Sequence, residues 1–131
     1  MNFLLDTHVA LWAVTNNPRL PQSARTYIEG PKVAVWVSAA SVWEISIKHA
    51  LGQSRANAMP ISGEAACAAF KGTDFGILAI TGEHAACAGA LPRHHGDPFD
   101  RMLVAQAMTD SLVLITHDQV LATYHPGVIV V

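Results

Sequence analysis

Short runs of aliphatic and β-branched residues alternate with longer segments of helical periodicity, and this alternation restricts the fold more than any other feature of the chain. Five runs have the length and composition of strands buried on both faces, at residues 2–5, 33–37, 77–80, 112–115 and 128–131. Apolar residues recur at helical spacing in the segments 9–14, 24–28, 42–51, 64–71, 83–90, 102–107 and 120–124. Glycine and proline mark most of the joins. Such alternation predicts an α/β fold with a parallel sheet and helices on both of its sides.

Length and composition are those of one globular domain. The chain has 131 residues, of which 51% are hydrophobic and 14% are charged, so it can bury a core and is too apolar to be disordered. It contains no internal repeat or linker-like segment, and we expect a single domain over residues 1–131. No apolar run approaches the roughly 18 residues of a membrane span, and the two cysteines form no CxxC pair. We therefore expect a cytoplasmic protein that does not contact a membrane.

Carboxylates are few, but several fall where a predicted strand meets a helix. Asp6 directly follows the first strand, Asp118 lies just past the fourth, and Glu44 is expected in the first turn of the helix after the second. Asp97 and Asp100 begin the helix that leads into the fourth strand. Open parallel sheets bind ligands outside the carboxyl ends of their strands, so these acids converge if the first strand is central. Because gathered carboxylates repel one another unless a divalent cation joins them, the pattern favours a Mg²⁺- or Mn²⁺-dependent phosphodiester hydrolase.

Each acid also has a structural explanation, which the sequence alone leaves open. Ser41 and Glu44 match the S-x-x-E capping box, a pair of hydrogen bonds at a helix start. Three further acids suit the first turn or the N-cap of a helix: Asp97 (followed by Pro98), Asp100 and Asp118. Asp6 is harder to explain in this way, because an acid after four buried strand residues is costly unless it is paired, hydrogen-bonded or metal-bound.

Histidines offer a competing interpretation of the same regions. Four of them lie within three residues of one of these acids: His8, His94, His95 and His117. A mixed histidine and carboxylate centre for a transition metal is therefore an alternative. No spacing matches a zinc signature such as H-E-x-x-H, and we expect His94 and His95 in a loop or at the rim of a site. The net charge of −2 lacks the basic character of a general nucleic-acid binder, although bound cations would offset it.

Four ordered segments of the chain resemble the motifs of the PIN-domain family, and the resemblance is nearest to its VapC-type toxin ribonucleases of type II toxin–antitoxin systems. The segments are Phe3–His8, Ser38–Lys48, His95–Ala107 and Ile115–Asp118. The resemblance runs in register from residue 3 to the C-terminus. It implies a three-layer α/β/α sandwich around a parallel sheet of about five strands, which agrees with the alternation described above.

The resemblance also implies roles for individual residues. Asp6, Glu44, Asp100 and Asp118 match the four catalytic acids of the family, and the expected metal ligands are Asp6, Asp100, Asp118 and the additional acid Asp97. Whether Asp97 or Asp100 lies nearer the metal stays open. Thr7 and Thr116 match positions where a hydroxyl often supports the acidic cluster.

The activity implied by the resemblance is a Mg²⁺- or Mn²⁺-dependent endoribonuclease, the toxin of a toxin–antitoxin pair, in which a metal-activated water cleaves RNA phosphodiester bonds. A VapB-type antitoxin and a homodimer are the expected partners besides RNA. Lys48 and Arg101 are candidate phosphate contacts, although ordinary salt bridges are the simpler interpretation. Trp12 and Trp43 could stack on bases, but their helical spacing favours the core or an interface.

Two alternative functions belong to different classes. One is a catalytically inactive PIN-like module that binds RNA or a protein, and the presence of all four acids argues against it. The other is a phosphotransfer protein of the receiver or phosphatase kind. Such proteins generally carry an acid pair after the first strand and a lysine near a late one. Asp6 stands alone and Thr116–Asp118 contains no lysine, which disfavours this class.

Substitution of Asp6 tests the assignment directly. We expect Asp6→Asn to keep the fold and to lose both metal binding and RNA cleavage, because the amide preserves the shape of the side chain without its charge. Circular dichroism would check folding, calorimetry would measure metal binding, and gel electrophoresis would measure cleavage. Full metal-dependent cleavage by this variant would mean that the site is wrongly placed.

Overall fold

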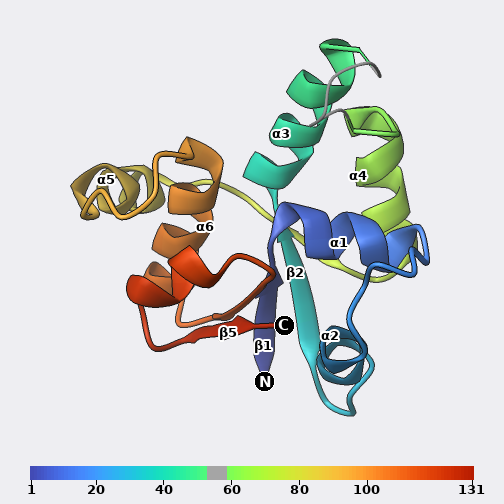
Figure 1. Ribbon diagram of the computed structural model, residues 1–131, viewed down its shortest axis with the longest axis horizontal. Coiled ribbons are helices and arrows are strands. Elements are labelled where there is room, and N and C mark those ends of the chain that lie inside the picture. The colour runs from blue at the N-terminus through green and yellow to red at the C-terminus, as the bar shows by residue number, and fades with distance from the viewer. Residues whose placement is uncertain (53–58) are drawn as a thin grey trace.

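A computed structural model describes residues 1–52 and 59–131, and within these ranges strands and helices alternate as expected (Figure 1). The elements are β1 (Asn2–Leu5), α1 (Thr7–Val14), α2 (Gln22–Ile28), β2 (Ala34–Ser38), α3 (Ala39–Ala50), α4 (Gly63–Gly72), β3 (Gly76–Leu78), α5 (Gly82–Ala90), α6 (Pro98–Thr109), β4 (Val113–Thr116), the 3₁₀ helix η1 (Gln119–Thr123) and β5 (Val128–Val130). The bounds of the five expected strands differ from these by at most two residues. None of the helices in the described ranges has the length and apolar character that a membrane crossing needs.

The sheet is parallel throughout, and β1 lies at its centre. The strand order is β3-β2-β1-β4-β5, with Leu5 opposite Val37 of β2 and Ile115 of β4. The chain thus builds one half of the sheet outward from β1 through β2 and β3, and then crosses to β4 on the other side. Because the strand order reverses between β1 and β4, a crevice opens at the carboxyl ends of these strands. The expectation that these two strands are neighbours is confirmed.

Two apolar layers cover the two faces of the sheet. Phe3 and Leu5 belong to a core shared with Val9 of α1 and Phe70 of α4, whereas Leu4 belongs to a second core. The second core contains Leu103 and Val104 of α6 and Leu121 of η1. In Figure 1, α1, α2 and α4 accordingly lie on one side of β1 and β2, and α5 and α6 lie on the other. The expected three-layer α/β/α sandwich is confirmed.

Polar caps begin most of the helices, and several of them are the acids singled out above. Asp97 caps α6 through the N–H groups of Phe99 and Asp100, with Pro98 in the first turn. Asp118 caps η1 by accepting from Val120 N–H. Asp6 caps α1 by accepting from Val9 N–H. A carboxylate at these positions satisfies free N–H groups and interacts favourably with the helix dipole.

The predicted capping box at Ser41 and Glu44 is wrong. The N-cap of α3 is Ser38, whose Oγ accepts from Ala40 N–H, so the helix begins directly after β2. Glu44 therefore lies in the second turn of α3 and not in the first. A serine that ends a strand can cap a helix without any intervening loop, which moves the helix start three residues ahead of the S-x-x-E motif.

Two glycines allow a matched test of the packing between α3 and α4. A Cβ added to buried Gly63 would lie 2.9 Å from Cβ of Ser46 and 3.2 Å from the carbonyl oxygen of Val42, whereas one added to Gly89 of α5 would meet nothing within 4 Å. We expect Gly63→Ala to lower the free energy of unfolding by about 1–3 kcal/mol through overpacking. Gly89→Ala should raise it by about 0.5–1 kcal/mol. Urea denaturation would measure both, and a stabilised Gly63→Ala variant would contradict the close approach of these helices.

Candidate metal centre

An open cavity of about 500 Å³ lies at the carboxyl ends of β1 and β4. The residues that line it are Asp6, Thr7, His8, Trp12, Arg19, Lys48, His95, Asp97, Asp100, His117 and Asp118. They come from α1, α3 and α6, from the segments that follow β1 and β4, and from the loops between α1 and α2 and between α5 and α6. The cavity thus occupies the place where open α/β sheets bind their ligands.

A second cavity, of about 520 Å³, lies at the opposite end of the sheet, where β2 and β3 begin. Trp36 and Asp74 are among the residues that line it, and Asp74 is its only carboxylate among the described residues. A single acid cannot create the like-charge repulsion that favours a divalent cation. The first cavity is therefore the candidate site, although the two are of similar volume.

Asp6 is held from three directions at the base of the cavity. Its Oδ1 accepts from Val9 N–H at 2.8 Å, and its Oδ2 accepts from Thr116 Oγ1–H at 2.5 Å and from His117 N–H at 3.1 Å. The side chain thereby joins the start of α1 to the end of β4. Burial raises the pKa of the Asp6 carboxyl above its ordinary value, while the hydrogen bonds from Thr116, Val9 and His117 oppose the rise.

Glu44 is reached through Thr7. The Thr7 hydroxyl lies 2.6 Å from Oε1 of Glu44 and 2.9 Å from Oγ of Ser41, so it connects the first turn of α1 to α3. The other oxygen of Glu44 pairs with Lys48, one helical turn along α3. Both oxygens of buried Glu44 thus have a partner beside the cavity, a hydroxyl group and an ammonium group.

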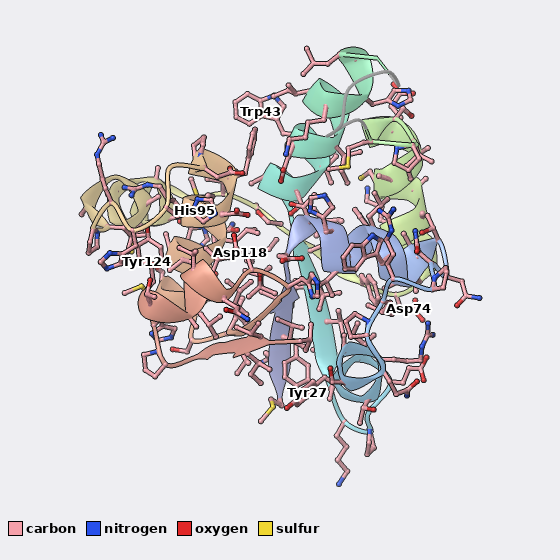
Figure 2. The ribbon with its side chains drawn as sticks, in the orientation of Figure 1. Tyr27, Trp43, Asp74, His95, Asp118 and Tyr124 are labelled. Atoms are coloured by element: carbon pink, nitrogen blue, oxygen red, sulfur yellow. The ribbon has the colours of Figure 1, made fainter. Side chains whose placement is uncertain are left out.

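His95 occupies the space between two of the expected acids. Its Nε2 lies 2.8 Å from Oδ2 of Asp118 and 3.2 Å from Oδ2 of Asp100, and ligand atoms of the three residues all lie within 4.8 Å of one another. Figure 2 shows His95 and Asp118 close together, with Tyr124 nearby. The Tyr124 hydroxyl accepts from His95 N–H at 2.8 Å and so holds this loop in place.

The backbone decides which nitrogen of His95 carries the proton. Nδ1 accepts from Asp97 N–H at 3.0 Å, so the proton of the neutral ring is on Nε2, which donates to Asp118. In this arrangement His95 orients the carboxylates of Asp118 and Asp100 from within the cluster. Sequence reasoning placed His95 in a loop or at the rim and missed this role. The available signal was its position two residues before an aspartate that caps a helix.

Asp100 is the acid most affected by its neighbours. Burial and then the charges of Asp97, Glu44 and Asp6 raise its pKa to about 7, and His95 acts in the opposite direction. Asp97 instead uses Oδ1 to cap α6. Of these two acids, Asp100 is the one grouped with His95 and Asp118.

The donor set fits a hard divalent cation. Carboxylate oxygens of Asp6, Asp100 and Asp118 line one cavity, and oxygen ligands are those that Mg²⁺ and Mn²⁺ prefer. Burial and then the charges of Asp97, Glu44 and Asp6 raise the pKa of Asp100, so negative charge is crowded there and a cation would relieve it.

Arg101 and Trp43 do not line the cavity. The Arg101 guanidinium donates to the carbonyl oxygens of Ala88, Leu91 and Pro92, at 2.9 to 3.1 Å, and so closes the end of α5. It takes no place among the residues that line the cavity. Trp43 is 62% exposed and meets Phe99 edge-on at 5.5 Å between ring centroids, so it is not a core residue. Lys48 and Trp12 do line the cavity.

Comparison with known proteins agrees with this fold. A family model of the PIN domain matches residues 3–125. A comparison with curated proteins found no match to the chain.

Several solved structures share the fold. A chain of VapBC2 from Rickettsia felis, bound to a DNA fragment from its promoter, aligns with a TM-score of 0.68 at 13% identity over 100% of this chain and 98% of that one. DNA-bound VapBC from Salmonella typhimurium aligns with a TM-score of 0.66 at 17% identity, over 100% of this chain and 97% of that one. VapC20 from Mycobacterium tuberculosis, a toxin that cleaves the sarcin-ricin loop, gives 0.62 at 14% identity, over 92% and 93%.

Removal of the Asp100 charge should stabilise the metal-free protein, because it relieves the repulsion among the carboxylates. The folded-state pKa near 7 exceeds the ordinary 3.8, so the stability that Asp100 contributes is complete below about pH 4 and is lost as the pH rises through 7. We therefore expect Asp100→Asn to be more stable than wild type by about 1–3 kcal/mol at pH 8, with a smaller difference at pH 5.

Urea denaturation in EDTA at both pH values would measure this effect. The matched control is Asp74→Asn, because Asp74 is exposed, lies outside the cluster and has φ of 63°, which asparagine tolerates. A loss of stability in Asp100→Asn that is as large at pH 8 as at pH 5 would contradict the proposed repulsion.

Proposed function

This chain belongs to the PIN domain family, and from that premise we propose that it is a divalent-metal-dependent endoribonuclease, the toxin of a VapBC-like pair. The observation that carries the proposal is the convergence of Asp6, Asp100 and Asp118 in the cavity between β1 and β4, with raised pKa values at Asp6 and Asp100. Crowded carboxylates at a switch point are suited to binding a cation and unsuited to binding RNA without one.

The proposed ligands of Mg²⁺ or Mn²⁺ are Asp6, Asp100 and Asp118, with Asp97 at the edge of the same cavity and Glu44 acting directly or through water. A divalent cation bound there would lower the pKa of a water molecule and neutralise charge on the scissile phosphate. No side-chain nucleophile is required for hydrolysis of this kind.

Hydrogen bonds from other residues of the chain would keep the carboxylates oriented toward a bound cation. Thr116 and the His117 N–H hold Asp6, Thr7 holds Glu44, and His95 holds Asp118. Orientation by such hydrogen bonds commonly governs metal affinity as strongly as the ligands do.

Lys48 is the residue of α3 that lines the cavity. It lines the cavity beside Glu44 and is the better candidate for a phosphate contact, since Arg101 is bound to backbone carbonyls. A phosphate oxygen could take the place of Glu44 as its partner when Glu44 turns toward a cation.

A partner protein is part of the proposal. Trp43 and Ile47 of α3 and its C-cap residue Leu51 are exposed at intervals of four residues, so they form one apolar stripe along that helix. Three of the structures that share the fold contain VapBC complexes by name, from Rickettsia felis, Salmonella typhimurium and Haemophilus influenzae. We propose a VapB-type antitoxin as the partner, and a homodimer as the second assembly that such a stripe supports.

The test is cleavage of total cellular RNA by the isolated, folded and partner-free protein. We expect discrete fragments with Mg²⁺ or Mn²⁺ and none with EDTA, because the carboxylates alone repel the phosphate. Asp6→Asn should lower the cleavage rate at least 100-fold, and Asp74→Asn should leave it unchanged. Intact RNA under every condition would reject the ribonuclease and favour a non-catalytic binding module.

A further inference from the structure

We propose that Trp12, His8, His117 and Arg19 form a nucleobase subsite that binds one unpaired base of the RNA beside the scissile phosphate. This inference rests on the proposed function and specifies its substrate as single-stranded at that position. All four residues line the cavity that contains the carboxylates. Their side chains form none of the side-chain hydrogen bonds that hold the acids. The arrangement of the acids therefore does not explain why these rings and this guanidinium line the cavity.

The aromatic rings form a connected group. Trp12 and His8 lie one turn apart on α1, with ring centroids separated by 5.9 Å, and the Trp12 ring meets His117 edge-on at 5.5 Å. Trp12 is half-buried because it packs against the core shared by α1 and α4, while His8 and His117 are exposed. A large ring that is fixed by the core on one side and open to a cavity on the other is a suitable stacking platform.

His117 is held in place by the C-terminal residue. Its Nδ1 lies 2.7 Å from a backbone oxygen of Val131, and because that oxygen only accepts, Nδ1 carries the proton. Nε2 of the neutral ring is then an acceptor, which suits the exocyclic amino group of a base. The ring of His117 is therefore oriented before any ligand arrives.

The position of the group relates it to the phosphate that would be cut. His8 is two residues beyond Asp6, and His117 N–H donates directly to Oδ2 of Asp6. His117 also immediately precedes Asp118. A nucleotide whose phosphate contacts the acids would thus place its own base, or that of its neighbour, against these rings.

Arg19 supplies positive charge at the same end of the cavity. Among the described residues, the ion pairs formed by lysine and arginine are Arg25–Glu29 and Lys48–Glu44, and neither includes Arg19. Its side chain is exposed at the rim. A guanidinium without an acidic partner, next to stacked rings, matches recognition of a phosphate that flanks a stacked base.

Binding of short RNA with hydrolysis-resistant phosphorothioate linkages, measured with Mg²⁺ present, tests the subsite separately from catalysis. Fluorescence anisotropy would measure the Kd of labelled ten-residue homopolymers of A, C, G and U. We expect Trp12→Ala to weaken binding roughly 5- to 100-fold, and Trp12→Phe to stay within about threefold of wild type because it keeps an aromatic face. Tyr27→Ala, which removes an exposed aromatic ring outside the cavity, should bind like wild type.

Two further variants keep the test decisive if Trp12→Ala does not fold. His8 and Arg19 are exposed, so His8→Ala and Arg19→Gln should remain folded by circular dichroism. We expect both to weaken binding, and Arg19→Gln to reduce its dependence on salt. Duplex RNA should show no dependence on Trp12, since its bases are already stacked.

The outcomes distinguish this inference from the proposed function. If wild-type protein binds or cleaves RNA while the Trp12, His8 and Arg19 variants bind it equally well, the subsite is refuted and the ribonuclease stands. If wild-type protein neither binds nor cleaves any RNA, the proposed function itself fails. Loss of antitoxin binding with unchanged RNA binding would assign these rings to the partner and overturn the inference.

Discussion

Repulsion among carboxylates at the centre of a parallel sheet is the constraint on which the rest of this structure depends. Asp6 ends β1, the middle strand, so its charge lies where the sheet and both helical layers meet. Burial raises its pKa, and three donors from α1, β4 and the segment after β4 oppose that rise. The same contacts join these elements to one another. The fold and the site therefore share one set of hydrogen bonds.

Helix caps and side-chain hydrogen bonds hold the acids of the cluster in place. Asp97 and Asp118 serve as helix caps, Glu44 is matched by Thr7 and Lys48, and Asp118 also accepts from His95. For Asp100, burial and then the charges of Asp97, Glu44 and Asp6 raise the pKa to about 7, while His95 opposes the rise. A buried acid that lowers the stability of the fold in this way is characteristic of sites that bind charged ligands. The structural and functional interpretations of these acids thus hold together and are not alternatives.

Local sequence signals predicted the elements well and their side-chain partners poorly. Alternating runs located all five strands, and Asp97 before Pro98 was recognised as a helix cap because that geometry depends only on neighbouring residues. Ser41 and Glu44 looked like a capping box, but Thr7, 34 residues away from Ser41, takes both as partners. Arg101 follows Asp100 in the sequence, but its guanidinium donates to backbone carbonyls at the end of α5 and does not face the cavity. Contacts between distant segments are not encoded in a local pattern.

The sequence by itself determined the α/β class and the position of Asp6 and Asp118 just past the ends of two strands, since periodicity and strand composition suffice for these. The central position of the first strand came from the structure. Only the tertiary structure decided which groups share the cavity. It brought His95 between Asp100 and Asp118 and set its proton on Nε2 through the Asp97 N–H. It also placed Trp12 and Arg19 beside the acids. The physical reason is that pKa values, tautomers and cavities depend on burial and on neighbours across the sheet, which form only when β1 and β4 pair.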